Sequence, residues 1–75
     1  MNKLRRAQLR KWLKDLELIR DELERILDDE QEYYDNIPEN LQGADRACDS
    51  EEAIDQMNEA VSSIEDAISM IEEIV

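Results

Sequence analysis

The sequence contains no histidine and no phenylalanine, and it has only one glycine, one proline and one cysteine among 75 residues. Without histidine, neither a di-iron helical bundle nor a zinc site of the ordinary kind is available. A lone cysteine excludes an internal disulfide, which fits a reducing compartment. Glycine and proline are both absent before residue 38, so nothing interrupts a helix over the first half of the chain.

Long apolar runs are absent as well. The basic start is not followed by the apolar segment of a signal peptide, and no stretch approaches the roughly 20 apolar residues of a membrane span. We therefore expect a cytoplasmic protein that does not bind membranes.

Charged residues make up 40% of the chain, and its few β-branched residues are concentrated near the end, which favours an all-α protein. A chain of this length forms one domain at most, spanning residues 1–75, and buries only about 60% of the surface that its unfolded form exposes. Its core must be small. We therefore expect self-association or a protein partner to bury further apolar surface and stabilise the fold.

The clearest pattern lies in residues 53–75, where apolar residues alternate at steps of three and four, as in helices that pack along a seam. A second line follows beside it at steps of seven, with Ala53, Ala60, Ala67 and then Ile74. Small residues there would let another helix approach closely. The predicted seam of this helix consists of Ile54, Met57, Val61, Ile64, Ile68 and Ile71.

Residues 2–35 predict a first long helix with the same spacing. Its predicted seam consists of Leu9, Trp12, Leu16, Ile19, Leu23, Ile26, Tyr33 and Ile37. Leu13, Leu27 and Tyr34 widen the apolar surface on one flank. Glu30 interrupts the seam, and its carboxylate is expected to reach solvent or a turn amide; a buried acid with a raised pKa would need a pocket and a second polar group.

The turn is predicted at residues 36–43, because Pro38 disfavours a helical conformation before it and cannot donate a hydrogen bond. Leu41 is expected to close the end of the core. A second helix over residues 44–75 follows, although Asp49 with Glu52 would also fit a later capped start. The prediction is an antiparallel two-helix hairpin, coiled-coil-like, that dimerises into a four-helix bundle.

The block EYYDNIPENLQGADR, residues 32–46, resembles a motif of small, largely uncharacterised helical proteins of Gram-positive gut bacteria and their phages and mobile elements. The match is close from Glu32 to Gly43. It departs at Ala44, where a serine cap is common, and at Ala47 and Cys48, where an aromatic residue is more usual. The resemblance implies a helical hairpin and a phage or mobile-element origin, and it implies no activity.

The net charge of −12 is unevenly distributed, because six of the nine cations lie in the first fourteen residues. In a hairpin these cations would lie beside the carboxylates at the end of the second helix, which we favour. The rival hypothesis is contact with nucleic acid, with Trp12 stacking on bases; the acidic remainder of the chain argues against it. The cations in question are Lys3, Arg5, Arg6, Arg10, Lys11 and Lys14, and the carboxylates are Glu65, Asp66, Glu72 and Glu73.

No catalytic, cofactor or metal motif rises above background, and three nearby acids disfavour a reactive thiolate at Cys48. We expect a non-enzymatic protein without a cofactor, active in protein–protein interaction or assembly. Leu4 and Leu18, together with Trp12 and Leu13, are the candidate association surface. The alternative is an acidic inhibitor that imitates nucleic acid and occupies the basic channel of a host or defence enzyme.

Overall fold

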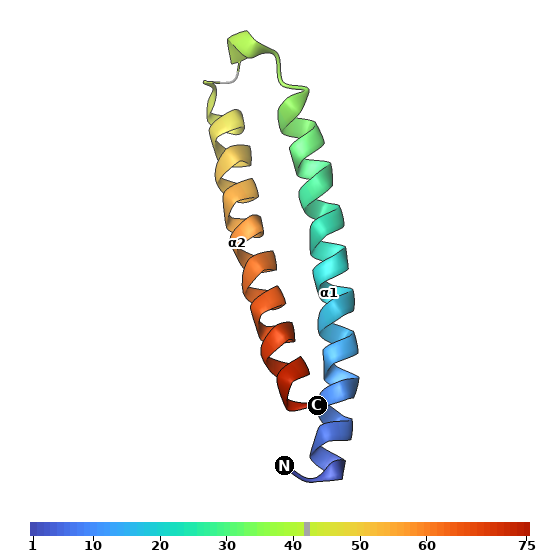
Figure 1. Cartoon of the computed structure of the whole chain (residues 1–75). Helices are drawn as coiled ribbons and strands as arrows, with labels where there is room; N and C mark the ends of the chain where they lie inside the picture. Colours follow the sequence, from blue (N-terminus) through green and yellow to red (C-terminus); the bar gives the residue numbers. More distant parts are fainter. Residues whose placement is uncertain (42) are drawn as a thin grey trace.

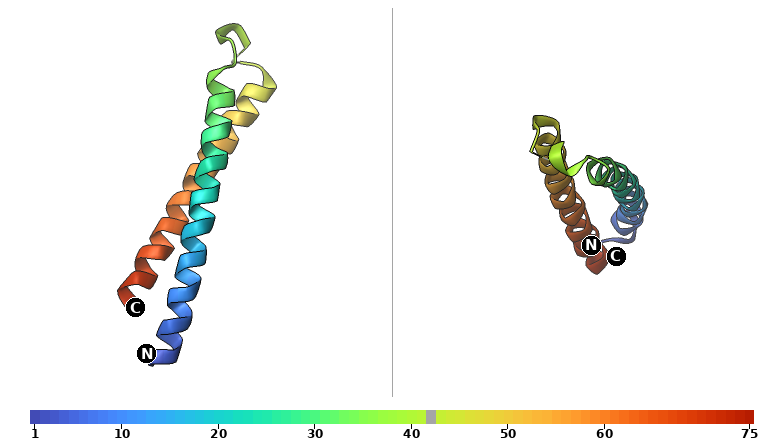
Figure 2. Two further views of the ribbon diagram at one scale, coloured as in Figure 1. Left: turned by 90° about the vertical axis from the view of Figure 1, so that its right-hand side faces the viewer. Right: turned by 90° about the horizontal axis from the view of Figure 1, so that it is seen from above.

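The computed structural model describes residues 1–41 and 43–75, and it is all helical. Two long helices, α1 (Lys3–Asp35) and α2 (Asp45–Ile74), lie side by side in opposite directions (Figure 1). The turn between them holds the short 3-10 helix η1 (Glu39–Leu41). Figure 2 shows the two long helices crossing at a shallow angle, with both chain ends at the same end of the molecule. The predicted helical hairpin is confirmed.

Helix α1 begins at a side-chain cap and ends just before a proline. The side chain of Asn2 accepts a hydrogen bond from the backbone N–H of Arg5 at 2.8 Å, which satisfies one of the free donors of the first turn. At the other end, the N–H of Ile37 donates to the carbonyl of Tyr34 at 3.1 Å. Pro38 follows and has no N–H with which to extend the ladder.

The turn uses backbone hydrogen bonds in place of side-chain caps. The carbonyl of Pro38 accepts from the N–H of Leu41 at 2.8 Å, and that of Leu41 accepts from the N–H of Ala44 at 3.0 Å. Helix α2 then starts at Asp45, with Ala44 as an N-cap that makes no side-chain hydrogen bond. Of the two predicted starts, the earlier one is found. The predicted turn includes residue 42, which lies outside the described residues.

The hairpin is a thin rod whose Cα atoms extend 59 × 14 × 13 Å. It exposes 5765 Å² of surface, whereas a compact monomer of its mass, 8.8 kDa, would expose about 4,800 Å². No residue of α1 is buried, and the buried apolar residues are Ile37, Ala47, Ile54, Val61 and Ile68. The single chain therefore has a narrow core supplied almost wholly by α2. No helix in the described part of the chain is long and apolar enough to cross a membrane.

Candidate interaction surface

The seam between the helices follows a heptad in which positions a and d face the neighbouring helix. In α2, position a holds the buried residues Ala47, Ile54, Val61 and Ile68. Position d holds Met57, Ile64 and Ile71, which are half-buried, and Ser50, which is buried. All six residues predicted for the seam of this helix are thus buried or half-buried.

The seam of α1 differs from the predicted one. Its half-buried apolar residues are Leu13, Leu27 and Tyr34 at position a, with Leu9, Leu16 and Leu23 at position d. The flank of the predicted stripe therefore lies in the seam, whereas four of the eight residues of the predicted seam are exposed. Trp12, Ile19, Ile26 and Tyr33 are 57%, 50%, 46% and 46% exposed. The prediction that Leu41 closes the end of the core is also wrong, because its side chain is 38% exposed.

Trp12, Ile19, Ile26 and Tyr33 recur at steps of seven and occupy position g of α1. Position g of α2 holds Ala53, Ala60, Ala67 and Ile74. In a pair of antiparallel helices, the two g positions lie on the same side of the seam. Both lines therefore border one long side of the hairpin, with the half-buried d residues between them. We call these eight residues the apolar face.

Further exposed apolar side chains flank the apolar face. Leu18 forms an open depression on α1 with Trp12, Leu16, Ile19 and Asp15. Leu4 and Met70 are 68% and 64% exposed near the open end of the hairpin. Of the residues predicted for association, Leu4, Trp12 and Leu18 are thus exposed, whereas Leu13 is half-buried in the seam.

The opposite long side is polar along its whole length. Position e holds Lys3, Arg10, Glu17, Glu24 and Gln31 in α1, and Glu51, Asn58, Glu65 and Glu72 in α2. We call these nine residues the charged face. Arg20, a cation at position a, lies at the edge of this face and donates to Asp21 at 3.2 Å. That hydrogen bond, followed by the charges of Asp21, Glu24 and Glu65, raises the pKa of Arg20 despite partial desolvation.

One polar contact crosses the seam near the turn. The hydroxyl of Ser50 donates to a carboxylate oxygen of Glu30 at 2.8 Å, and Ser50 is only 3% exposed. Each residue interrupts the apolar seam of its own helix, and the fold places them opposite one another. Glu30 therefore finds a hydroxyl of α2 where the sequence predicted solvent or a turn amide. A polar pair of this kind satisfies both groups only in one alignment of the helices.

At the open end, the predicted ion pairing between the two helices is not found. Lys3, Arg5, Arg6 and Lys11 are exposed. Arg10 donates a hydrogen bond of 3.4 Å to the main-chain oxygen of Val75, the residue that follows α2, and not to a carboxylate. The Lys11 ammonium lies 5.2 Å from the centre of the Trp12 ring. Among the described residues, ion pairs join residues of α1 only.

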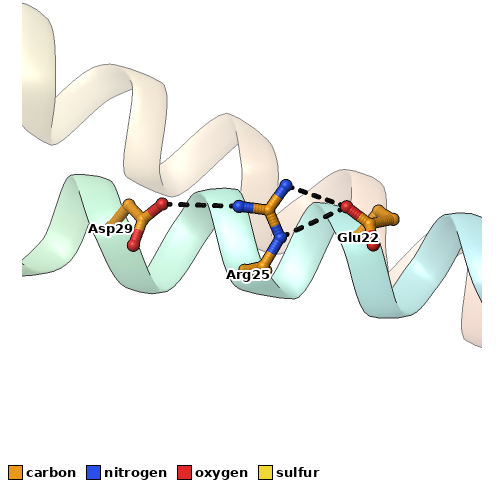
Figure 3. Close-up of polar contacts among 3 residues, drawn as sticks. All are labelled: Glu22, Arg25 and Asp29. Carbon is orange, nitrogen blue, oxygen red and sulfur yellow. Dashed lines mark hydrogen bonds and ion pairs between the residues drawn. The ribbon is translucent and has the colours of Figure 1, made fainter.

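The largest of these ion-pair groups lies on the solvent side of α1 (Figure 3). Arg25 donates to Glu22 at 2.9 Å and lies 3.8 Å from Asp29, which are the neighbours expected one helical turn away on either side. The hydrogen bond to Glu22 is the main cause that raises the pKa of Arg25. All three side chains are exposed, so this group supports α1 without ordering the contact between the helices.

No cluster of three or more Cys, Asp or Glu side chains in residues 1–41 and 43–75 could hold a metal ion. Cys48 is exposed. No protein-family model, no curated protein and no solved structure matches this chain.

Proposed function

We propose that this chain is a small, non-enzymatic interaction or assembly protein that acts by packing its apolar face against another helical surface. The observation that carries the proposal is the exposed line Trp12, Ile19, Ile26 and Tyr33 along α1. Large apolar side chains repeated every seven residues on a soluble helix are typical of a second packing seam. A charged side chain at these positions would have kept the hairpin soluble as a monomer.

The simplest partner is a second copy of the chain, which would give a four-helix bundle. The hairpin exposes about 1,000 Å² more than a compact monomer of its mass, and a stable interface buries roughly 800 Å² from each partner. The excess surface is thus of the size that one such contact would remove. The thin core of the single chain supports the same proposal, because two helices with so few buried side chains gain little on folding alone.

Sedimentation equilibrium and circular dichroism over one dilution series test this proposal. We expect the mass of a dimer at high concentration, and we expect dissociation and loss of helix to occur together on dilution. A chain that stays a folded monomer throughout, with a sharp thermal transition, would overturn the four-helix bundle. A phage or mobile-element origin is part of the proposal and rests only on the turn motif of residues 32–46.

A second function is favoured by the placement of charge. Apart from Lys3 and Arg10, the charged face carries no cation, and carboxylates continue along it toward the turn. Such a surface can imitate the phosphates of nucleic acid and bind the basic channel of a DNA-binding enzyme. An immobilised non-specific DNA-binding protein would test this, with duplex DNA as competitor. Retention that DNA abolishes would support it, and absence of retention at low salt would exclude it for that class.

A further inference from the structure

Net charge is divided unequally between the two ends of the hairpin. The hydrogen bonds Glu30–Ser50 and Arg10–Val75 each join residues that lie at about the same height along the two helices. Interpolation between these two contacts places residues 22–23 level with Ala60. Below this level, residues 1–22 and 60–75 contain seven cations and eight carboxylates, a net charge of −1. Above it, residues 23–59 contain two cations and thirteen carboxylates, a net charge of −11. Nearly all the charge is therefore in the turn half.

The cations at the open end also project beyond α2. Arg10 is level with Val75, and the N-terminal turns of α1 extend past the end of α2 (Figure 1). Seven residues at about 1.5 Å each make an overhang of roughly 10 Å. It carries Lys3, Arg5 and Arg6, all exposed. An overhang with three cations is suited to contact an acidic surface on another molecule.

We infer that the apolar face binds a second copy of this chain whose turn lies at the open end of the first copy, an inference that rests on the proposed function. If the two turns lay together, two halves of charge −11 would be adjacent. In the arrangement we infer, each such half lies against a half of charge −1. The overhang of each copy then lies beside Asp35 and Glu39 at the turn of the other, which supplies the acidic surface.

The apolar face accepts this arrangement along its whole length. A twofold axis perpendicular to the rod, at the level of Ala60, brings each line of the face against its own copy. Along α1, Trp12 meets Tyr33 of the second copy and Ile19 meets Ile26 of the second copy. Along α2, Ala60 meets its own equivalent and Ala53 meets Ala67 of the second copy. One axis serves both helices, which a closed dimer requires.

Spin-label distances measured in the dimer test this inference at three positions that share one place in the heptad. Cys48 is exposed and native, and Ser62 and Ser69 lie fourteen and twenty-one residues further on, also exposed on the outer side of α2. Each position is labelled singly, the last two as Ser62→Cys and Ser69→Cys in a Cys48→Ser background. Sedimentation of each labelled protein shows separately whether it is a dimer.

The two orientations give different patterns. With turns at opposite ends, the rise of about 1.5 Å per residue predicts a distance of roughly 40 Å at position 48, about 20 Å at 62 and about 33 Å at 69. This pattern, shortest in the middle, supports the inference. Three nearly equal distances of about 20–25 Å would overturn it while leaving the dimer intact. A monomer without intermolecular coupling would overturn the proposed four-helix bundle and this inference together.

Discussion

The two long sides of the hairpin have the same backbone geometry and opposite chemistry. Both lie one heptad position away from the seam, and both run the length of α1 and α2. On one side the apolar residues Trp12, Ile19 and Ile26 are about half exposed to solvent, whereas the other side is lined by charges such as Glu17, Glu24 and Glu65. Water solvates the charged side chains favourably, whereas exposure of the apolar side chains to water is unfavourable until another apolar surface packs against them.

The residues that stabilise the hairpin differ from those that it presents to a partner. Packing between the helices involves chiefly positions a and d, where α2 buries Ile54, Val61 and Ile68. A change at position g or e therefore leaves this seam largely intact. Substitutions at the two outer positions should consequently differ in their effect on association more than in their effect on helix content.

The largest expected effect comes from placing charge on the apolar face. The double variant Ile19→Asp with Ile26→Asp removes four large apolar side chains from a dimer, each worth about 1.5–3 kcal/mol when buried. We expect association to weaken by at least about 1,000-fold. Sedimentation equilibrium measures the change directly. The matched control, Gln31→Glu with Asn58→Asp, adds the same charge to the charged face and should remain a dimer; equal dissociation of both variants would show that net charge, and not the apolar face, governs assembly.

A smaller effect is expected at the polar contact within the seam. Ser50→Ala leaves the Glu30 carboxylate without its hydroxyl donor, which should lower the free energy of unfolding by about 1–2 kcal/mol. Replacing both, as Glu30→Leu with Ser50→Ala, should recover the loss, because no polar group then lacks a partner. Urea unfolding of Ser50→Ala, Glu30→Leu and the double variant measures the coupling between the two residues. Ser63→Ala, at an exposed position of the same helix, is the control, and a coupling near zero would mean that this contact does not align the helices.

The sequence predicted the helices and the turn well, but it did not predict which stripe of α1 faces α2. Trp12, Ile19 and Ile26 recur with the same period as Leu13 and Leu27, so periodicity alone cannot separate them. The obstacle was Arg20, which shares the line of Leu13 and Leu27 and makes that line look unfit for a seam. In the structure Arg20 lies at the seam's edge, where it donates to Asp21.

The cross-seam contact was missed for a related reason. Glu30 and Ser50 each look like a defect when one helix is read alone, and only the length of the turn decides that they meet. The alignment of the two helices depends on the conformation of the turn between them, which the spacing of residues along the sequence does not determine. The apolar lines, in contrast, were visible in the sequence because a repeat of seven needs no knowledge of the partner helix.

Reversing charge in the overhang should change association less, and the direction of the change shows whether the overhang contacts carboxylates. In the dimer that we infer, Arg5→Glu with Arg6→Glu removes contacts to the acidic turn of the second copy, and exposed pairs are worth about 0.2–1 kcal/mol each. We expect association to weaken several-fold in sedimentation experiments. Acids at the start of α1 suit the helix dipole, so α1 itself should become more helical. If association strengthened instead, the overhang would not lie beside carboxylates of a neighbouring chain.

The smallest effect is expected for the ion pairs on the solvent side of α1. Arg25→Ala removes the contacts to Glu22 and Asp29, but all three side chains are exposed and one turn apart, where water and salt already screen their charges. Alanine has at least the helix propensity of arginine, so the backbone loses nothing. We expect neither the urea midpoint nor the association constant to change measurably. A clear loss of association in this variant alone would place a binding surface on the solvent side of α1, and the distinction between an apolar binding side and a merely solvated one would fail.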